Sequence, residues 1–178
     1  MHLRNGLVVD TSIWINFLAT GRIWEIVSAL DVPCSTPDEV LKEVLRDPIS
    51  ATPFPSDQHP LRNRPELEIV SLEGQSLELF LELVSGGAAQ RLGDGEAAAI
   101  AVASARGWTI ALDERKARRV VRERFPNMSI MMTIDLLSLP SVTETLGADH
   151  ARDAIADAIK FGRMHIPKDW ASSGSKVD

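Results

Sequence analysis

The stretch from Leu7 to Ser12 constrains the fold of this chain more than any other. It begins with an apolar Leu-Val-Val run, reaches a carboxylate at Asp10, and continues into a helical pattern. A short apolar run of mostly β-branched residues that stops in this way is typical of a buried parallel strand. Asp10 is therefore predicted at the carboxyl end of a strand, which is where open α/β sheets bind their ligands.

The rest of the chain alternates further strand and helix patterns. Strands are expected at 32–35, 67–72, 108–112 and 128–132, and helices at 12–18, 23–30, 75–84, 97–105, 115–124 and 148–159, with others after Thr36 and from Thr133. This order predicts an α/β fold with a central parallel sheet of about five strands and helices on both faces. We expect residues 1–170 to form a single domain, and the small and polar residues 171–178 to fray.

Composition narrows the class of protein. The net charge of −6 and the pI near 5.2 exclude a protein that coats nucleic acid through bulk positive charge, but they allow a local basic patch. The single cysteine, Cys34, excludes an internal disulfide, and no apolar run is long enough to suggest a membrane span. We therefore expect a cytoplasmic protein that contacts any nucleic acid through a defined site.

One face of the predicted 115–124 helix is basic. The arginines on that face are Arg115, Arg118, Arg119 and Arg122. Such a run is usually a solvated face, but this one begins directly after the acidic pair Asp113–Glu114 at a predicted strand end. Contact with a phosphate backbone is therefore a competing interpretation.

Four acidic residues are candidates for a shared site. Asp10 and Asp113 each follow a predicted strand, and the carboxyl ends of parallel strands lie at one edge of a sheet. Glu43 and Glu96 lie on predicted helices that can lean over the same crevice. Glu96 also has a structural interpretation, because it begins a buried alanine-rich helix whose dipole it complements.

The role of Glu43 is ambiguous from the pattern alone. The run Thr36-Pro37-Asp38-Glu39 predicts a capping box, which gives Glu39 a structural role. On the helix that follows, Glu43 lies nearer the edge of the apolar stripe than Glu39 does. The pattern does not decide whether Glu43 faces the crevice.

Two segments have no assigned role. The segment 47–65 holds five prolines and one histidine, His59, and its length suggests binding or mobility, although a histidine in such a loop is usually only solvated. The segment Phe161–Trp170 is apolar enough to dock on another chain or, as is commoner, on its own core.

Carboxylates that meet without a counter-charge repel one another and take up protons, so the four acids call for a cation. Oxygen ligands without cysteine or histidine partners favour Mg²⁺ or Mn²⁺ over Zn²⁺. In such a site these ions promote phosphodiester hydrolysis, because they activate water and stabilise charge on the attacking and leaving oxygens. No protein nucleophile is needed.

Two other functions fit parts of the pattern. Asp10-Thr11-Ser12 could be the nucleophile loop of a phosphatase that forms an aspartyl-phosphate, but such enzymes usually need a second aspartate where Ser12 stands. The other is a non-catalytic scaffold that binds RNA or a protein partner. The presence of all four acids weighs against the scaffold.

Taken in order, the acidic motifs resemble those of the PIN domain family. They are Val8-Val9-Asp10-Thr11-Ser12, Glu43 in a helix after Ser-Thr-Pro, Gly95-Glu96-Ala97-Ala98-Ala99-Ile100-Ala101, and Leu112-Asp113-Glu114-Arg115-Lys116-Ala117-Arg118. The resemblance covers about residues 6–132 and is strongest to VapC-like bacterial toxin ribonucleases and their relatives. It implies a PIN-like fold and an Mg²⁺- or Mn²⁺-dependent ribonuclease, often a homodimer and, in the toxin branch, often neutralised by a small antitoxin.

The resemblance also implies roles for individual residues. The expected catalytic acids and metal ligands are Asp10, Glu43, Glu96 and Asp113, with Glu114 as an extra or alternative ligand. The expected substrate-binding residues are Thr11, Ser12, Arg115, Arg118, Arg119 and Arg122, where Thr11 or Ser12 would hold a metal-bound water or a phosphate. It is the resemblance, rather than periodicity, that favours Glu43 over Glu39.

Overall fold

The computed structural model describes residues 3, 5–55, 57–85, 91–168 and 170. Within them, five parallel strands form one sheet in the order β3-β2-β1-β4-β5. The strands are β1 (Leu7–Val9), β2 (Cys34–Pro37), β3 (Leu67–Val70), β4 (Thr109–Ala111) and β5 (Ile130–Met131). This confirms the predicted parallel sheet, with strand ends that differ from the expected ones by at most about two residues, as is usual at element boundaries.

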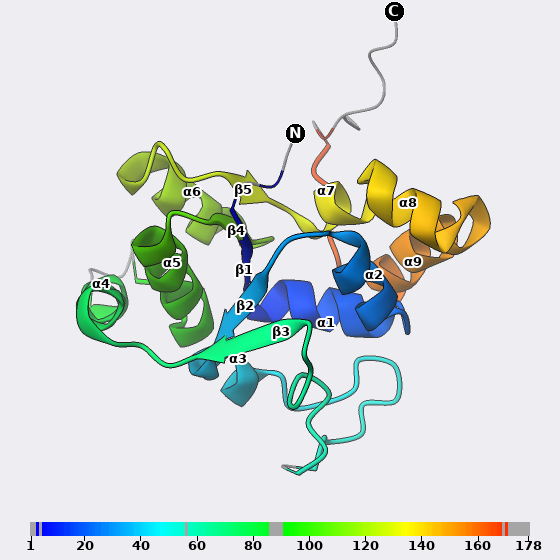
Figure 1. Ribbon diagram of the computed structural model, residues 1–178, viewed down its shortest axis with the longest axis horizontal. Helices are drawn as coiled ribbons and strands as arrows, with labels where there is room; N and C mark the ends of the chain where they lie inside the picture. The colour runs from blue at the N-terminus through cyan, green and yellow to red at the C-terminus, as the bar shows by residue number, and fades with distance from the viewer. Residues whose placement is uncertain (1–2, 4, 56, 86–90, 169, 171–178) are drawn as a thin grey trace, which may run out of the picture.

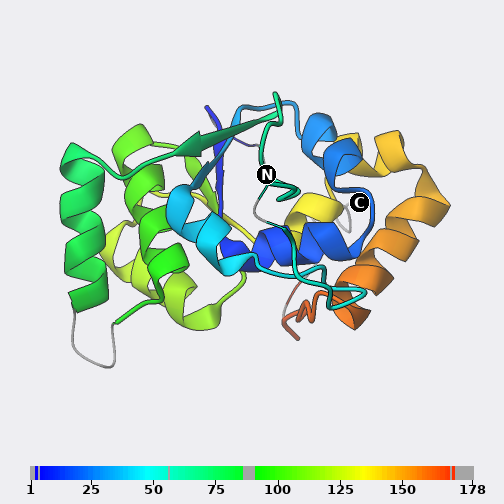
Figure 2. The same ribbon diagram turned by 90° about the horizontal axis from the view of Figure 1, so that it is seen from below.

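Helices cover both faces of the sheet (Figure 1). On one face lie α5 (Asp94–Arg106) and α6 (Arg115–Arg124), with α4 (Gly74–Ser85) packed against α5. On the other face lie α1 (Thr11–Ala19), α2 (Ile23–Ala29), α7 (Thr133–Leu137), α8 (Pro140–Leu146) and α9 (Ala148–Lys160), as Figure 2 shows from below. The short helix α3 (Asp38–Glu43) follows β2 and packs against α1 and α5.

The central strand β1 is buried on both sides, as its apolar run predicts. Side chains alternate between the faces of a strand, so Val8 packs into one apolar cluster with Ile100 of α5. Leu7 and Val9 pack into the other cluster with Phe17 of α1. Both clusters therefore anchor β1, and Asp10 directly follows this buried strand.

The alanine-rich helix α5 is packed on nearly all sides. Every residue from Ala97 to Ala103 is buried, and the helix ends at Gly107, which has a φ of +63° in the left-handed region that favours glycine. Small side chains let α5 approach its neighbours closely. This packing brings the amino terminus of α5, with Glu96, against α3.

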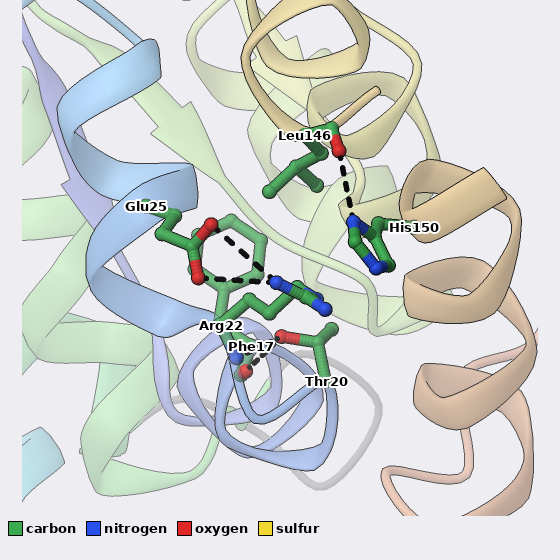
Figure 3. Close-up of polar contacts among 6 residues, drawn as sticks. All are labelled: Phe17, Thr20, Arg22, Glu25, Leu146 and His150. Atoms are coloured by element: carbon green, nitrogen blue, oxygen red, sulfur yellow. Dashed lines mark hydrogen bonds and ion pairs between the residues drawn. The ribbon is translucent and has the colours of Figure 1, made fainter. Parts of the chain in front are cut away.

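A polar turn joins α1 to α2 (Figure 3). Thr20 Oγ1 donates to the carbonyl of Phe17 (2.7 Å) and accepts from the backbone N–H of Arg22 (3.0 Å). In the same view, His150 Nδ1 of α9 lies 3.2 Å from the carbonyl of Leu146 at the end of α8. These contacts connect consecutive helices on the face of the sheet that carries α1.

The helix α8 is not among the helices expected from the sequence. It begins with Pro140 at its first helical position, and only Val142 and Leu146 of its residues are buried. Two apolar positions are too few to give a helical period in the sequence.

The predicted capping box at Thr36 is wrong. Strand β2 continues to Pro37, and α3 begins at Asp38 without a side-chain cap. The hydroxyl of Thr36 is engaged elsewhere, because it donates to the carbonyl of Val9 (2.9 Å) and accepts from the indole N–H of Trp14 (3.1 Å). Tertiary hydrogen bonds within the core replace the local cap.

The proline-rich segment between α3 and β3 is anchored to the domain. Residues Arg46 and Pro53 form an isolated antiparallel bridge, and Leu61 is fully buried. His59 is half-buried, and its Nε2 lies 2.9 Å from the carbonyl of Val44. Burial lowers the pKa of His59, and its contact with the Val44 carbonyl supports a structural role for the ring.

The segment after α9 docks on the protein's own core. Met164 is buried there, and the indole N–H of Trp170 donates to Asp135 Oδ1 (2.8 Å). The predicted frayed tail, residues 171–178, lies outside the described residues. Among the residues that are described, no helix has the length and apolar character to cross a bilayer.

Candidate active site

The sheet order creates a switch point between β1 and β4. From β1 the chain proceeds to β2 and β3 on one side, and it then crosses back to β4 and β5 on the other. Crevices at such points, outside the carboxyl ends of the strands, are where open α/β sheets bind ligands. Asp10 follows β1 directly and Asp113 follows β4 after one residue, so both predicted strand-end acids lie at this crevice.

Asp10 is almost completely buried, with 1% of its surface exposed. Its Oδ1 accepts hydrogen bonds from the backbone N–H of Ile13 (3.1 Å) and the hydroxyl of Ser12 (2.8 Å), so it also caps α1. Burial raises the pKa of Asp10 to about 8, with smaller contributions from repulsion by Asp113 and Glu96, although the two hydrogen bonds oppose the rise. An ionised Asp10 therefore needs a cation nearby.

Asp113 is held by three hydrogen bonds from two residues. Its Oδ1 accepts from the backbone N–H of Thr133 (2.8 Å), and its Oδ2 accepts from the Thr133 hydroxyl (2.6 Å) and from Asn16 Nδ2 (2.7 Å). Burial raises the pKa of Asp113, while these hydrogen bonds and the charge of Arg118 act in the opposite direction. The carboxylate is thereby fixed in orientation.

Asn16 and Thr133 were not identified as site residues from the sequence. Asn16 is a buried polar residue on the apolar face of α1, and that exception to the pattern is a signal that could have found it. Thr133 stands where a helix cap was expected, and it begins α7. Its contact with Asp113 spans 20 residues of sequence and had no local signal.

Glu43 joins three helices at their ends. It is the last residue of α3, and its Oε2 accepts from the hydroxyl of Thr11 at the start of α1 (2.5 Å). Its Oε1 accepts from the backbone N–H of Gly95 in the first turn of α5 (2.9 Å). A Cβ atom on Gly95 would lie 2.5 Å from Glu43 Oε2 and 2.6 Å from Thr11 Oγ1, so only glycine permits this approach.

Glu96 caps the amino terminus of α5 and is also affected by the charges of neighbouring acids. Its Oε2 accepts from the backbone N–H of Gly93 (3.1 Å) at the amino terminus of α5. Burial raises the pKa of Glu96, and repulsion from Glu114 and Glu43 adds to the rise. Glu114 is exposed, and it caps α6 through the backbone N–H of Lys116 (3.4 Å).

The donor chemistry of these acids fits a hard divalent cation. Electrostatic repulsion connects Asp10 with Asp113 and Glu96, and connects Glu96 with Glu43 and Glu114. In the part of the chain that the structure describes, however, no three acidic, histidine or cysteine side chains are gathered closely enough to ligate one ion as they stand. Their carboxylates are instead satisfied by hydroxyl, side-chain amide and backbone donors, which a bound cation would have to replace in part.

A cavity of about 850 Å³ begins at this site. Ser12, Asn16, Asp113 and Glu114 contribute to its lining. The same cavity is lined by basic residues of α6, namely Arg115, Arg118 and Arg122. Arg119 does not line it and forms an exposed ion pair with Glu123 (3.9 Å).

The sheet and its switch-point acids define an α/β protein with an acidic crevice beside a basic cavity. A family model described as a PIN domain matches residues 6–172, and the chain therefore belongs to the PIN domain family. PIN domains are generally nucleases, which are hydrolases that generally use divalent metal ions. No curated protein and no solved structure matches the chain.

Proposed function

We propose that this protein is an Mg²⁺- or Mn²⁺-dependent endoribonuclease with its active site at the β1–β4 switch point. The observation that carries the proposal is the pair of strand-end acids, the buried Asp10 and the half-buried Asp113, of which Asp113 lines a cavity that is also lined by arginines. Buried carboxylates with raised pKa values favour binding of a cation, and the arginines favour binding of a phosphate backbone.

The proposed metal ligands are the acids predicted from the sequence: Asp10, Glu43, Glu96 and Asp113, with Glu114 as an additional or alternative ligand. A divalent cation would supply Lewis acidity there, which makes water a better nucleophile and offsets charge on phosphate oxygens. The chain's own groups would orient the acids, since Asn16 and Thr133 hold Asp113 and Ser12 holds Asp10.

The proposed set of substrate-binding residues is smaller than the set predicted from the sequence, because it omits Arg119. Arg115, Arg118 and Arg122 line the cavity, which supports contact with RNA phosphates. The hydroxyls of two other members of the set donate hydrogen bonds to the proposed metal ligands: Thr11 to Glu43 and Ser12 to Asp10. Arg119 is left out because it pairs with Glu123 outside the cavity.

The resemblance to VapC-like ribonucleases supports a finer proposal. In it, the protein is a cytoplasmic toxin of a toxin–antitoxin pair, acts as a homodimer, and is neutralised by a small antitoxin. Measurement of its molar mass in solution tests the dimer. Growth arrest on expression, abolished by Asp10→Asn, tests the toxin role.

A non-catalytic PIN scaffold that binds RNA or a protein partner remains the alternative. One experiment separates the two: incubation of a mixed RNA pool with the protein and Mg²⁺ or Mn²⁺, with an EDTA control. We expect cleavage by the wild type, none with EDTA, and a loss of about 10³-fold or more in Asp10→Asn. Asp149→Asn, which removes an acid from an exposed ion pair, should cleave normally. Folded wild type that binds RNA without cutting it would favour the scaffold.

A further inference from the structure

The segment after α9 forms a second lining of the cavity beside the active site. Its residues Gly162 to Lys168, except Ile166, and Trp170 line the same cavity as Asp113 and the arginines of α6. The segment, which we call the C-terminal wall, is the orange stretch that follows α9 in Figure 2. The acids and α6 come from earlier parts of the chain, so the cavity forms only when this segment folds back over them.

The C-terminal wall is fixed by contacts with the core. The backbone N–H of Met164 donates to the carbonyl of Ala158 (3.0 Å), and the Met164 side chain is buried. Gly162 lies so close to α1 that a Cβ atom on it would be 2.3 Å from Asn16 Oδ1. Since Asn16 also donates to Asp113, the wall abuts the residue that orients a proposed metal ligand.

The wall adds positive charge to the cavity. Arg163, His165 and Lys168 are exposed and line it. Among the described residues, neither Arg163 nor Lys168 forms an ion pair. In a chain whose net charge is −6, unpaired cations gathered on one cavity indicate a polyanionic ligand.

The wall also places an aromatic residue, Trp170, on the lining of the cavity. Trp170 is half-buried, and the hydrogen bond from its indole N–H to Asp135 Oδ1 (2.8 Å) fixes the ring. Cations that track a phosphate backbone together with an aromatic surface for bases are the usual means of binding single-stranded nucleic acid. A duplex hides its base faces by stacking, so it could not use the ring.

We infer that the C-terminal wall binds single-stranded RNA on the side of the cleavage site away from α6, with Arg163 and Lys168 on phosphates and Trp170 against a base. The inference rests on the proposed nuclease function and adds to it a second substrate-binding surface with named contacts. Because these contacts lie outside the acid cluster, they act on substrate binding rather than on the chemical step.

The test compares Arg163→Ala/Lys168→Ala with a charge-matched control, Arg22→Ala/Arg152→Ala. Arg22, which precedes α2, pairs with Glu25, and Arg152 of α9 pairs with Asp149; both arginines lie outside the cavity. Binding is measured by fluorescence anisotropy in an Asp10→Asn background, with a labelled single-stranded RNA of roughly 12 nucleotides and its duplex. Steady-state cleavage of the same strand is measured in the otherwise wild-type background.

We expect the wall variant to bind the single strand about tenfold more weakly, with a salt slope lower by about 1.4 because two phosphate contacts are lost. Its KM should rise about tenfold while kcat stays unchanged, and the control should match the wild type. Trp170→Ala should weaken binding of the single strand more than binding of the duplex, about tenfold against less than twofold.

The outcomes separate the two proposals. Wild type that neither cuts nor binds RNA would overturn the proposed function and with it the inference. Wild type that cuts, together with a folded wall variant equal to the control in KM and salt slope, would overturn the inference alone. Tighter binding of the duplex than of the single strand would overturn the proposed contact of Trp170 with an unpaired base.

Discussion

The acids at the floor of the cavity and the cations on its walls differ in burial and in how firmly their side chains are fixed. The floor consists of Asp113, which lines the cavity, and Asp10, which accepts a hydrogen bond from the lining residue Ser12. Asp10 is buried and Asp113 is half-buried, and both are fixed by hydrogen bonds and have raised pKa values. The wall cations, such as Arg122 and Lys168, are exposed and have long, adaptable side chains. Burial makes the floor sensitive to pH and to bound cations, whereas exposure makes the walls sensitive to salt. The acids with fixed geometry thus serve the proposed chemical step, and the cations with adaptable side chains serve substrate binding.

The largest expected effect is on the free energy of unfolding of the metal-free protein, which should depend on pH through the floor acids. Because the folded-state pKa of Asp10 is raised from 3.8 to about 8, the folded state retains a proton that the unfolded chain loses. The free energy of unfolding therefore falls as pH rises from about 4 to about 8, by up to about 1.4 kcal/mol per pH unit from this group. Glu96 and Asp113, whose pKa values are also raised, add to the same trend.

This sign is checked by urea unfolding in EDTA at about pH 5.5 and about pH 7.5. Wild type should lose about 3 kcal/mol of unfolding free energy between these two pH values, and Asp10→Asn should lose much less because asparagine does not titrate. The variant should still fold, since the asparagine Oδ1 can accept from Ser12 and Ile13. Asp149→Asn serves as the control and should behave as the wild type. Equal losses in wild type and Asp10→Asn would mean that Asp10 is not the group responsible.

The next largest effect should come from a single methyl group at Gly95. Gly95→Ala places a Cβ atom 2.5 Å from Glu43 Oε2, so Glu43 must move away from Thr11 and the amino terminus of α5. We expect cleavage to fall about 100-fold, as an active-site displacement of about 1 Å can cause. Gly93→Ala is the matched control, since its Cβ would meet only Glu96 Oε2, at 3.7 Å. Similar rates in the two variants would place Glu43 outside the catalytic machinery.

A smaller effect should follow removal of one hydroxyl behind Asp113. Thr133→Val keeps the volume of this buried side chain and removes its 2.6 Å hydrogen bond to Asp113 Oδ2. We expect kcat to fall about tenfold with little change in KM, and the acid limb of the pH–rate profile to shift to higher pH, because the ionised carboxylate loses a donor. Thr133→Ser should restore both values. A Ser variant as slow as the Val variant would indicate a packing effect instead.

The same division between floor and walls explains what the sequence could predict. The apolar run before Asp10 and the acid Asp113 at the end of the predicted 108–112 strand place both residues at one edge of a parallel sheet, because strand ends follow from local pattern. The contact between Asn16 and Asp113 spans 97 residues, and no local pattern encodes it. The C-terminal wall is similar: its docking on the core could be expected from Met164 and Trp170, but its place beside the acids could not.

Glu43 is a residue whose role could not be predicted from the local sequence pattern. Periodicity left its role open, and the capping box predicted beside it does not form, because Thr36 bonds to Val9 and Trp14 instead. The resemblance to PIN domains selected Glu43. The structure then supplies the physical partner that the sequence pattern lacked, the backbone N–H of Gly95.

The smallest expected effect distinguishes two adjacent arginines of α6. Arg118 lines the cavity, and its charge lowers the pKa of Asp113, whereas Arg119 pairs with Glu123 outside the cavity. Arg118→Ala should raise KM several-fold and lower the salt slope of RNA binding by about 0.7, which is one phosphate contact. Arg119→Ala should change KM less than about twofold, since exposed ion pairs contribute little. Equal effects from the two changes would mean that α6 acts through its total charge, and the distinction between a cavity wall and a solvated face would not hold.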